Sequence, residues 1–389
     1  MAFYDLIVVG AGALGTFHAY HAARAGQRVL LLEKDSYPVG ATVRNFGQVV
    51  PSGLAGRWFD YGRRSLEIYK AIQHETDLTV RPNGSVYIAS DTDELTLINE
   101  LHDRYVGVGY PCELLTKAQC LAKYPALQPD YVLGGLYFPD EVSVEPEQMV
   151  HRLIAYIRQK YNVAYQSGSA VIDCQSNYNG AIVTLAGPRQ THRQRFQADR
   201  LLICSGHEVR LLFPDVLAEA DLVVSKLQML MTKPMPDVDL RGNILTGLTI
   251  RRYESFRECP SYAGLTTPEH LAELKQWGIH VLFKQAIDGS FIIGDSHEYA
   301  PATQAENLGY HTQAHINQLI LDEARRIVRF PVEPIRKEWA GFYSQTDKEI
   351  FEYDVDEHIR IITGIGGKGM TSGAGFAEAS IRQWLGVSV

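Results

Sequence analysis

The segment Tyr4-Asp5-Leu6-Ile7-Val8-Val9-Gly10-Ala11-Gly12-Ala13-Leu14-Gly15 decides the fold of this chain. Its apolar start is typical of a buried parallel strand, and residues 14–25 and 28–32 predict a helix and a second strand. The three glycines have the GxGxxG spacing and lie between the first strand and the helix, where Gly12 lets the backbone approach a diphosphate. The segment therefore predicts a βαβ unit that binds a dinucleotide.

The flanking residues agree with this prediction. Ala13 and Leu14 open a helix whose free N–H groups and dipole favour a bound diphosphate. Glu33, followed by Lys34, ends the second predicted strand, 18 positions after Gly15. There its carboxylate can accept hydrogen bonds from ribose hydroxyls, and it would repel a 2′-phosphate, which disfavours NADP. Alone, Glu33 would more often be a solvated charge.

Composition limits the class of protein. A chain of 389 residues is long enough for two domains, and a net charge of −8 offers no basic surface for nucleic acid. We expect a cytoplasmic protein without a membrane-spanning segment, since the first apolar run is short and has no basic leader. The five cysteines form no CxxC pair, so we expect no disulfide framework and no metal site. They are Cys112, Cys120, Cys174, Cys204 and Cys259.

Patterning along the chain predicts an α/β (α+β) protein in which a Rossmann-like domain is joined to a mainly antiparallel substrate-binding sheet. The expected cofactor domain is discontinuous and comprises residues 1–85, 143–222 and 334–389, and the substrate domain comprises 86–142 and 223–333. Helices are expected at 146–160, at 307–328 and from about Ser372. Strands are expected within 78–90, 134–138, 163–174, 181–185, 200–204 and 359–363, with a hairpin at 283–293 that turns at Asp288-Gly289.

Four further motifs follow the glycine turn: Thr42-Val43-Arg44-Asn45-Phe46-Gly47, Val144-Glu145-Pro146, residues 198–206 (ADRLLICSG) and residues 362–370 (ITGIGGKGM). Together with the turn, and in this order, they resemble the FAD-dependent amine and D-amino-acid oxidoreductases, a family that includes glycine oxidase and sarcosine oxidase. The resemblance spans nearly the whole chain and implies that the dinucleotide is FAD.

The same resemblance implies which residues contact the cofactor. The segment after the second strand runs under the flavin in that family, and the C-terminal glycine loop approaches the flavin from a helix N-terminus. Besides Gly10, Gly12, Ala13, Leu14, Gly15, Glu33 and Lys34, the expected contacts are Thr42, Arg44, Asn45, Phe46, Gly47, the backbone of Val171, Ser205, Gly206, Gly364, Gly367, Lys368, Gly369, Met370 and Thr371.

Lys368 is a departure from the family, since histidine is common at its position in the C-terminal loop. An ammonium group there could stabilise the negative charge that reduction deposits on the flavin, which makes Lys368 a catalytic candidate. A solvated loop lysine is the alternative.

Two other departures lie in residues 339–345, Trp-Ala-Gly-Phe-Tyr-Ser-Gln. Sarcosine oxidases carry a flavin-tethering cysteine in this segment, and its absence here implies noncovalent FAD. Glycine and D-amino-acid oxidases carry an arginine that grips the substrate carboxylate, whereas this chain has Phe342 and Tyr343. The usual clamp for an α-amino acid is therefore missing.

Within the family, the chain most resembles the FAD-dependent oxidoreductases associated with phosphonate catabolism, through residues 44–47, residues 289–296 (GSFIIGDS) and residues 367–371 (GKGMT). This resemblance implies an aminophosphonate substrate, such as 2-aminoethylphosphonate or its N-methyl derivative. Charge-assisted hydrogen bonds suit a dianion, although any single cation in the chain could also be a solvated surface charge. The candidate anion-binding residues are Arg251, Arg252, Lys284 and His297, and Tyr253, Tyr343 and His297 are candidate polar or catalytic lining.

The expected reaction is hydride transfer from the carbon next to a neutral amine, which gives an imine that water hydrolyses to an aldehyde. Oxygen or another acceptor then takes the electrons. The alternatives are a D-amino-acid, glycine or sarcosine oxidase or dehydrogenase, and a noncatalytic flavoprotein subunit.

Overall fold

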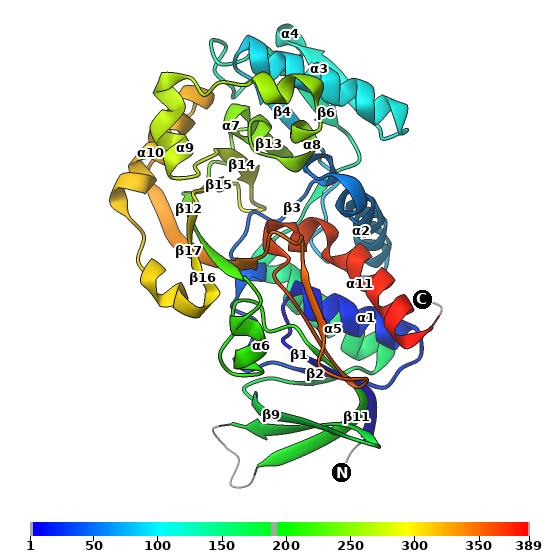
Figure 1. Cartoon of the computed structure of the whole chain (residues 1–389). Helices are drawn as coiled ribbons and strands as arrows, with labels where there is room; N and C mark the ends of the chain where they lie inside the picture. Colours follow the sequence, from blue (N-terminus) through cyan, green and yellow to red (C-terminus); the bar gives the residue numbers. More distant parts are fainter. Residues whose placement is uncertain (1–2, 188–192, 388–389) are drawn as a thin grey trace.

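The computed structural model describes residues 3–187 and 193–387. Within these residues, the strands form an eight-stranded sheet, a nine-stranded sheet and a two-stranded sheet, which we call the first, second and third sheets. Figure 1 shows the first sheet, with β1, β2, β9 and β11, in the lower half of the molecule and the second sheet, with β4, β6 and β12 to β15, in the upper half. The mixed α/β class predicted from the sequence is confirmed.

The first sheet has the order β18-β19-β11-β1-β2-β8, with β10 and β9 continuing from β11. Strand β1 pairs in parallel with β2 and β11, and β19 and β8 extend this parallel centre. Its strands are β1 (Phe3–Val9), β2 (Val29–Leu32), β8 (Ala164–Gln166), β9 (Ala170–Asn177), β10 (Gly180–Ala186), β11 (Gln194–Ile203), β18 (Phe351–Asp354) and β19 (Ile359–Thr363).

Both faces of β1 are buried, which explains its continuous apolar sequence. Leu6 and Val8 pack into a core shared with the helices α1, α2, α5 and α11, whereas Ile7 points into a core on the opposite face with β9 and β10. The helices of the chain are α1 (Ala13–Arg24), α2 (Gly56–Glu75), α3 (Thr92–Gly107), α4 (Lys117–Lys123), α5 (Pro146–Tyr161), α6 (Pro214–Ala218), α7 (Gly247–Ile250), α8 (Glu254–Arg257), α9 (Ala272–Gln276), α10 (Ala314–Ile327) and α11 (Gly369–Leu385).

The second sheet has the order β16-β12-β15-β14-β13-β4-β6-β5, and β17 pairs along β12. Helices α3, α7 and α8 contribute to the core on one face, and α4, α9 and α10 to the core on the other. Its strands are β4 (Ser85–Ala89), β5 (Glu113–Thr116), β6 (Gly134–Phe138), β12 (Val223–Thr232), β13 (Asn243–Thr246), β14 (Leu282–Gln285), β15 (Phe291–Gly294), β16 (Glu298–Pro301) and β17 (Ile335–Gln345); β3 (Gln48–Val49) and β7 (Val142–Ser143) form the third sheet.

Strand β17 links the two halves of the molecule. Most of it pairs antiparallel with β12, but Phe342 packs against the core of the first sheet and Gln345 forms a bridge with Ile365. The expected boundary at residue 334 assigns this strand to the cofactor domain, whereas its hydrogen bonds place it in the second sheet. The strand consequently carries side chains of the second sheet to the edge of the first.

Several expected elements differ at their ends. The helix expected at 307–328 begins at Ala314, because Gly309 has φ = 62° and ends a separate 3-10 turn. The last helix begins at Gly369, three residues before Ser372. Of the strand expected within 78–90, residues 85–89 form β4.

Other expected elements are confirmed. Strand β6 covers residues 134–138 and α5 begins at Pro146, as predicted. The β14–β15 hairpin forms around Gly289, whose φ of 83° requires the left-handed region. Among the residues that the structure describes, no helix is long and apolar enough to span a membrane.

Candidate active site

The glycine turn is formed by backbone that leaves no room for side chains at two positions. Gly10 has φ = 97°, and a Cβ there would overlap the carbonyl oxygen of Cys204. A Cβ on Gly15 would overlap the carbonyl oxygen of Gly10. These two glycines therefore let α1 pack closely on β1, while Gly12 has an ordinary φ of −66° and only a side-chain oxygen close to its Cβ position.

Two side chains brace the turn. Glu33, which is 8% exposed, accepts the Ala11 N–H at 3.0 Å through Oε2 and the Asp35 N–H at 3.0 Å through Oε1. Thr42 Oγ1 accepts the Ala13 N–H at 2.8 Å. Both side chains also line a cavity in front of the turn, so they hold the turn and remain beside the space that a ligand would fill.

The segment after β2 folds over the same cavity. Asn45 donates to the carbonyl oxygens of Ala41 and Thr42 and accepts the Gly47 N–H at 2.7 Å. Arg44 donates from Nη1 to the Ala340 carbonyl, and the Trp339 indole donates back to the Arg44 carbonyl. These bonds fasten the segment to β17.

The cavity has a volume of about 490 Å³ and runs from the glycine turn to the C-terminal loop. Most of the expected cofactor contacts line it: Gly10, Gly12, Ala13, Leu14, Gly15, Glu33, Lys34, Thr42, Arg44, Asn45, Val171, Ser205, Gly206, Gly364, Gly367, Gly369 and Met370. The buried Ser205 Oγ has no hydrogen-bond partner among the described residues, and Gly12, the N-cap residue of α1, has no side chain to cap the helix. Unpaired donors next to a glycine-lined cavity fit a phosphate-containing cofactor.

Four expected contacts lie outside the cavity lining. Phe46 is buried in a core on one face of the second sheet, and a Cβ on Gly47 would overlap the Val144 carbonyl oxygen. Both residues therefore shape the segment after β2. Thr371 Oγ1 bonds within the fold to the Val50 N–H.

Lys368 is the fourth of these residues. Its Nζ lies 3.7 Å from Glu254 Oε1 and 5.2 Å from the centre of the Trp58 ring. The Lys368 side chain thus lies beside Glu254 and Trp58 and does not line the cavity, whereas the glycine loop around it leads into a helix, α11, as predicted.

The inner wall of the cavity comes from β17. Phe342 stacks on His207, with ring centres 5.8 Å apart, and Tyr343 and Ser344 follow it. Burial raises the pKa of Tyr343 and lowers that of His207, so both side chains are neutral near pH 7. Sequence reasoning missed His207, whose signal was its position directly after Ser205-Gly206.

Two of the expected anion-binding cations are held in internal ion pairs. Arg251 Nε lies 2.8 Å from Glu94 Oε1, and its Nη2 pairs with Asp91. Lys284 is fully buried, 2.9 Å from Glu145 Oε1. The expectation that Arg251 and Lys284 grip a substrate anion is therefore wrong, because burial with a carboxylate already satisfies each charge.

The other expected substrate residues do come together. Arg252 Nη2 donates to the Tyr299 hydroxyl at 2.9 Å, and the His297 ring stacks on Tyr299. His297 also stacks on His280, with ring centres 5.4 Å apart, and Tyr253 meets His280 edge-on. These residues form a polar cluster, which we call the Arg252 cluster.

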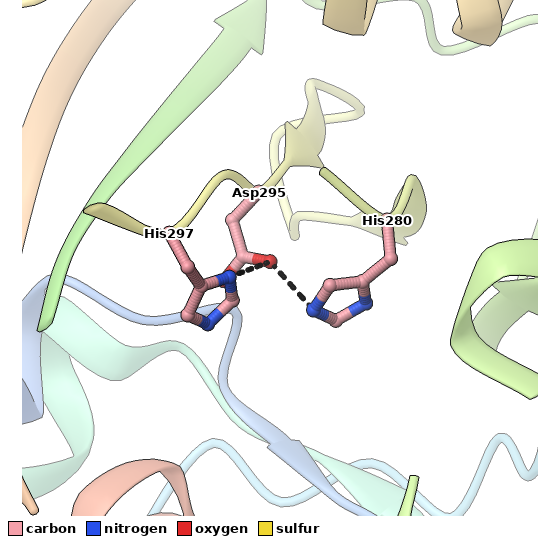
Figure 2. Close-up of side chains that lie close together, drawn as sticks. All are labelled: His280, Asp295 and His297. Atoms are coloured by element: carbon pink, nitrogen blue, oxygen red, sulfur yellow. Dashed lines mark ion pairs between the residues drawn. The ribbon is translucent and has the colours of Figure 1, made fainter. Parts of the chain in front are cut away.

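Asp295 lies between the two histidine rings of this cluster (Figure 2). Its negative charge is among the causes, after burial, that raise the pKa of Tyr343. Sequence reasoning missed His280, and it used Asp295 only as part of the 289–296 motif. Neither residue has a local sequence signal, since the hairpin alone brings them together.

The parallel strand order, the glycine turn and the acidic end of β2 define the class of nucleotide-cofactor proteins with a Rossmann-like domain. The chain belongs to the FAD dependent oxidoreductase family (DAO), whose family model matches residues 5–382. FAD is thus its cofactor, and the protein is an FAD-dependent oxidoreductase.

Relatives in this family share modest sequence identity with the chain. An opine oxidase subunit from Rhizobium meliloti is 24% identical over 369 residues, which cover 91% of this chain and 85% of that protein. Glycine oxidase of Geobacillus kaustophilus (strain HTA426) is 22% identical over 218 residues, covering 52% of this chain and 54% of that protein. The crystal structure of glycine oxidase from Geobacillus kaustophilus matches with a TM-score of 0.77 at 17% identity, over 100% of this chain and 96% of that chain.

Proposed function

We propose that this protein oxidises the C–N bond of a small amine, and that the resulting imine is hydrolysed to an aldehyde. The observation that carries the proposal is one continuous cavity lined by the glycine turn at one end and by Tyr343 and the C-terminal glycine loop at the other. When bound there, FAD supplies the electron acceptor for a hydride from the carbon next to nitrogen. Similarity to glycine oxidase and to an opine oxidase supports an amine substrate.

The chain's own residues supply the cavity wall. Phe342, buried Tyr343 and the loop at residues 363–367 line the cavity, so an amine bound against them would displace water from this wall. Arg44 is fixed by its bond to the Ala340 carbonyl, so its position in the wall does not depend on a ligand. No protein base is needed if the amine arrives neutral.

The finer proposal concerns the substrate's anionic group, which we take to be a phosphonate. Phe342 and Tyr343 stand on β17 where the family resemblance implies a carboxylate-binding arginine, and the Arg252 cluster offers a cation with histidine and tyrosine donors nearby. A phosphonate is largely dianionic near neutral pH and has three acceptor oxygens, which several donors can share. The favoured substrates are 2-aminoethylphosphonate and its N-methyl derivative, both giving phosphonoacetaldehyde.

An amino-acid substrate is the second candidate, and the similarity to glycine oxidase favours it. The two are separated by mixing the FAD-loaded protein anaerobically with each amine and following flavin absorbance. We expect bleaching by the aminophosphonates, with little by glycine, sarcosine or D-alanine. Faster bleaching by an amino acid would replace the phosphonate proposal. A flavin that no amine bleaches would favour a noncatalytic subunit.

A variant tests the Arg252 cluster directly. Arg252→Met should raise the KM for 2-aminoethylphosphonate about tenfold or more, since a hydrogen bond to a charged group contributes about 1.5–3 kcal/mol. Lys275→Met is the matched control, because Lys275 is bonded to Thr267 on the surface. An unchanged KM in Arg252→Met would remove this residue from the site.

A further inference from the structure

His280, Asp295 and His297 reach one point because of the β14–β15 hairpin. His280 and Asp295 exchange backbone hydrogen bonds of 3.1 and 3.0 Å, so they lie directly opposite each other and share a face. His297 follows Asp295 by two residues, and its Nδ1 lies 3.9 Å from Asp295 Oδ1. Figure 2 shows both rings beside the carboxylate.

The spacing of the donor atoms fits a metal ion better than an ammonium group. His280 Nε2 lies 3.0 Å from Asp295 Oδ1, and one ligand atom from each of the three residues falls within 4.8 Å of the other two. Tetrahedral bonds of about 2.0–2.1 Å place ligand atoms about 3.3 Å apart. Acceptors around an ammonium group at about 2.8 Å would be about 4.6 Å apart.

One oxygen of the Asp295 carboxylate lacks a well-aligned donor. Asp295 is 6% exposed, and its Oδ1 accepts no well-aligned hydrogen bond from the described part of the chain, although His280 Nε2 lies 3.0 Å away. A buried carboxylate oxygen without an aligned donor is unfavourable. Close contact without a hydrogen bond is what two ligands of a common ion show, because each lone pair points at the ion.

Both histidine rings are held in place by a hydrogen bond to a neighbouring group. The His280 Nδ1 bonds with Thr249 Oγ1 at 3.3 Å, and the His297 Nδ1 bonds with the Gly278 carbonyl at 3.1 Å. Such outer partners fix the ring orientation of metal-binding histidines, and these two bonds leave Nε2 of each ring as the ligand atom.

We propose that His280, Asp295 and His297 bind one divalent transition-metal ion of the zinc type. Two imidazoles and one carboxylate are a donor set that zinc accepts, and three protein ligands leave a coordination position open. Its occupant would be water or an anionic oxygen. An assignment of that oxygen to the substrate's phosphonate rests on the proposed function, whereas the metal site itself does not.

The test measures metal on the FAD-loaded protein without substrate. After chelator treatment and dialysis, Zn²⁺ titration followed by elemental analysis should give about one ion per chain. Co²⁺ in its place should give the visible absorption of a tetrahedral site. Asp295→Asn and His297→Gln should each weaken Zn²⁺ binding at least about tenfold. His315→Ala is the control, because His315 pairs with Glu273 at 2.9 Å on the surface and should leave the stoichiometry unchanged.

Several outcomes would overturn the site. Wild-type protein that takes up no Zn²⁺ or Co²⁺ would make the cluster a hydrogen-bonded triad, and uptake lost equally in His315→Ala would indicate surface binding. FAD content and circular dichroism establish whether each variant is folded. If Asp295→Asn does not fold, His297→Gln still tests the site. Amine oxidation without metal uptake would reject the metal site and keep the proposed function. Metal uptake without amine oxidation would keep the metal site and reject the proposed function.

Discussion

A substitution at Gly12 should weaken binding of the cofactor while the chain still folds. A Cβ at Gly12 would meet only Thr42 Oγ1, at 3.3 Å, whereas Gly10 and Gly15 face backbone oxygen atoms. Gly12→Val should therefore fold, yet its branched side chain would occupy the space in front of the α1 N-terminus. We expect FAD affinity to fall at least about tenfold, or 1.4 kcal/mol, measured by flavin fluorescence titration.

The matched control is Gly264→Val. A Cβ at Gly264 would have no atom of the described residues within 4 Å, and Gly264 lies in a 3-10 turn that is not part of the cavity lining. It should retain FAD. Full FAD content in a folded Gly12→Val protein would show that the turn does not bind the diphosphate through this glycine.

Glu141 gives the molecule a pH dependence of stability. The residue is fully buried, accepts the Ser52 N–H at 2.8 Å, and burial raises its pKa from 4.5 to about 7. The folded chain thus keeps a proton on Glu141 that the unfolded chain loses near pH 4.5, so stability falls as pH rises from about 4.5 to about 7. Between pH 5 and 8 this amounts to about 2–3 kcal/mol.

Glu141→Gln should remove that part of the slope, because the amide does not titrate. The measurement is the melting temperature of wild type and variant at intervals from pH 5 to 8, with all other titrating groups common to both. Parallel curves would show that Glu141 titrates at an ordinary pKa.

At the scale of elements, the contact between α11 and α2 depends on one small residue. A Cβ on Gly375 of α11 would overlap the carbonyl oxygen of Tyr61 in α2. Gly375→Ala should force the helices apart and lower the melting temperature by about 2–6 °C, because overpacking is unfavourable by about 1–3 kcal/mol.

The same helix provides the control for this prediction. A Cβ on Gly373 would have no atom within 4 Å in the part of the chain that the structure describes. Gly373→Ala should leave the melting temperature unchanged or raise it, since alanine favours helix by about 1 kcal/mol over glycine. Equal shifts in the two variants would contradict packing as the cause.

At the scale of the molecule, the sequence predicted what local patterns encode. The glycine turn, Glu33 and the segment around Thr42 line one cavity, and each could be found in the sequence from a spacing within one βαβ unit or from a family motif. Their contact with FAD stays a prediction. Arg251 and Lys284 were misassigned, since a lone cation in a sequence does not reveal the carboxylate that the fold brings to it.

The close approach of His280, Asp295 and His297 could not be predicted from the sequence for the same reason. His280 and Asp295 are 15 positions apart and meet only through the β14–β15 pairing, which a turn signal predicts without fixing the register. The direction of the Lys368 side chain also escaped prediction, because a loop motif fixes backbone and leaves the side chain to neighbours such as Glu254 and Trp58.

FAD binding should stabilise the whole chain without a covalent bond. The cavity is lined by β1, β2, the segment at residues 38–45, β17 and the α11 N-terminus, so a ligand there joins segments from both ends of the sequence. Cys204, the cysteine of the lining, is buried beside Gly10, and burial raises its pKa, which keeps the thiol protonated and unreactive. Acid precipitation should release all flavin into the supernatant, and removal of FAD should lower the melting temperature. A ligand at a hundredfold its Kd contributes about 2.7 kcal/mol to the native state. Flavin that stays with the precipitate would establish a covalent link, and an unchanged melting temperature would mean that these segments are ordered before FAD binds.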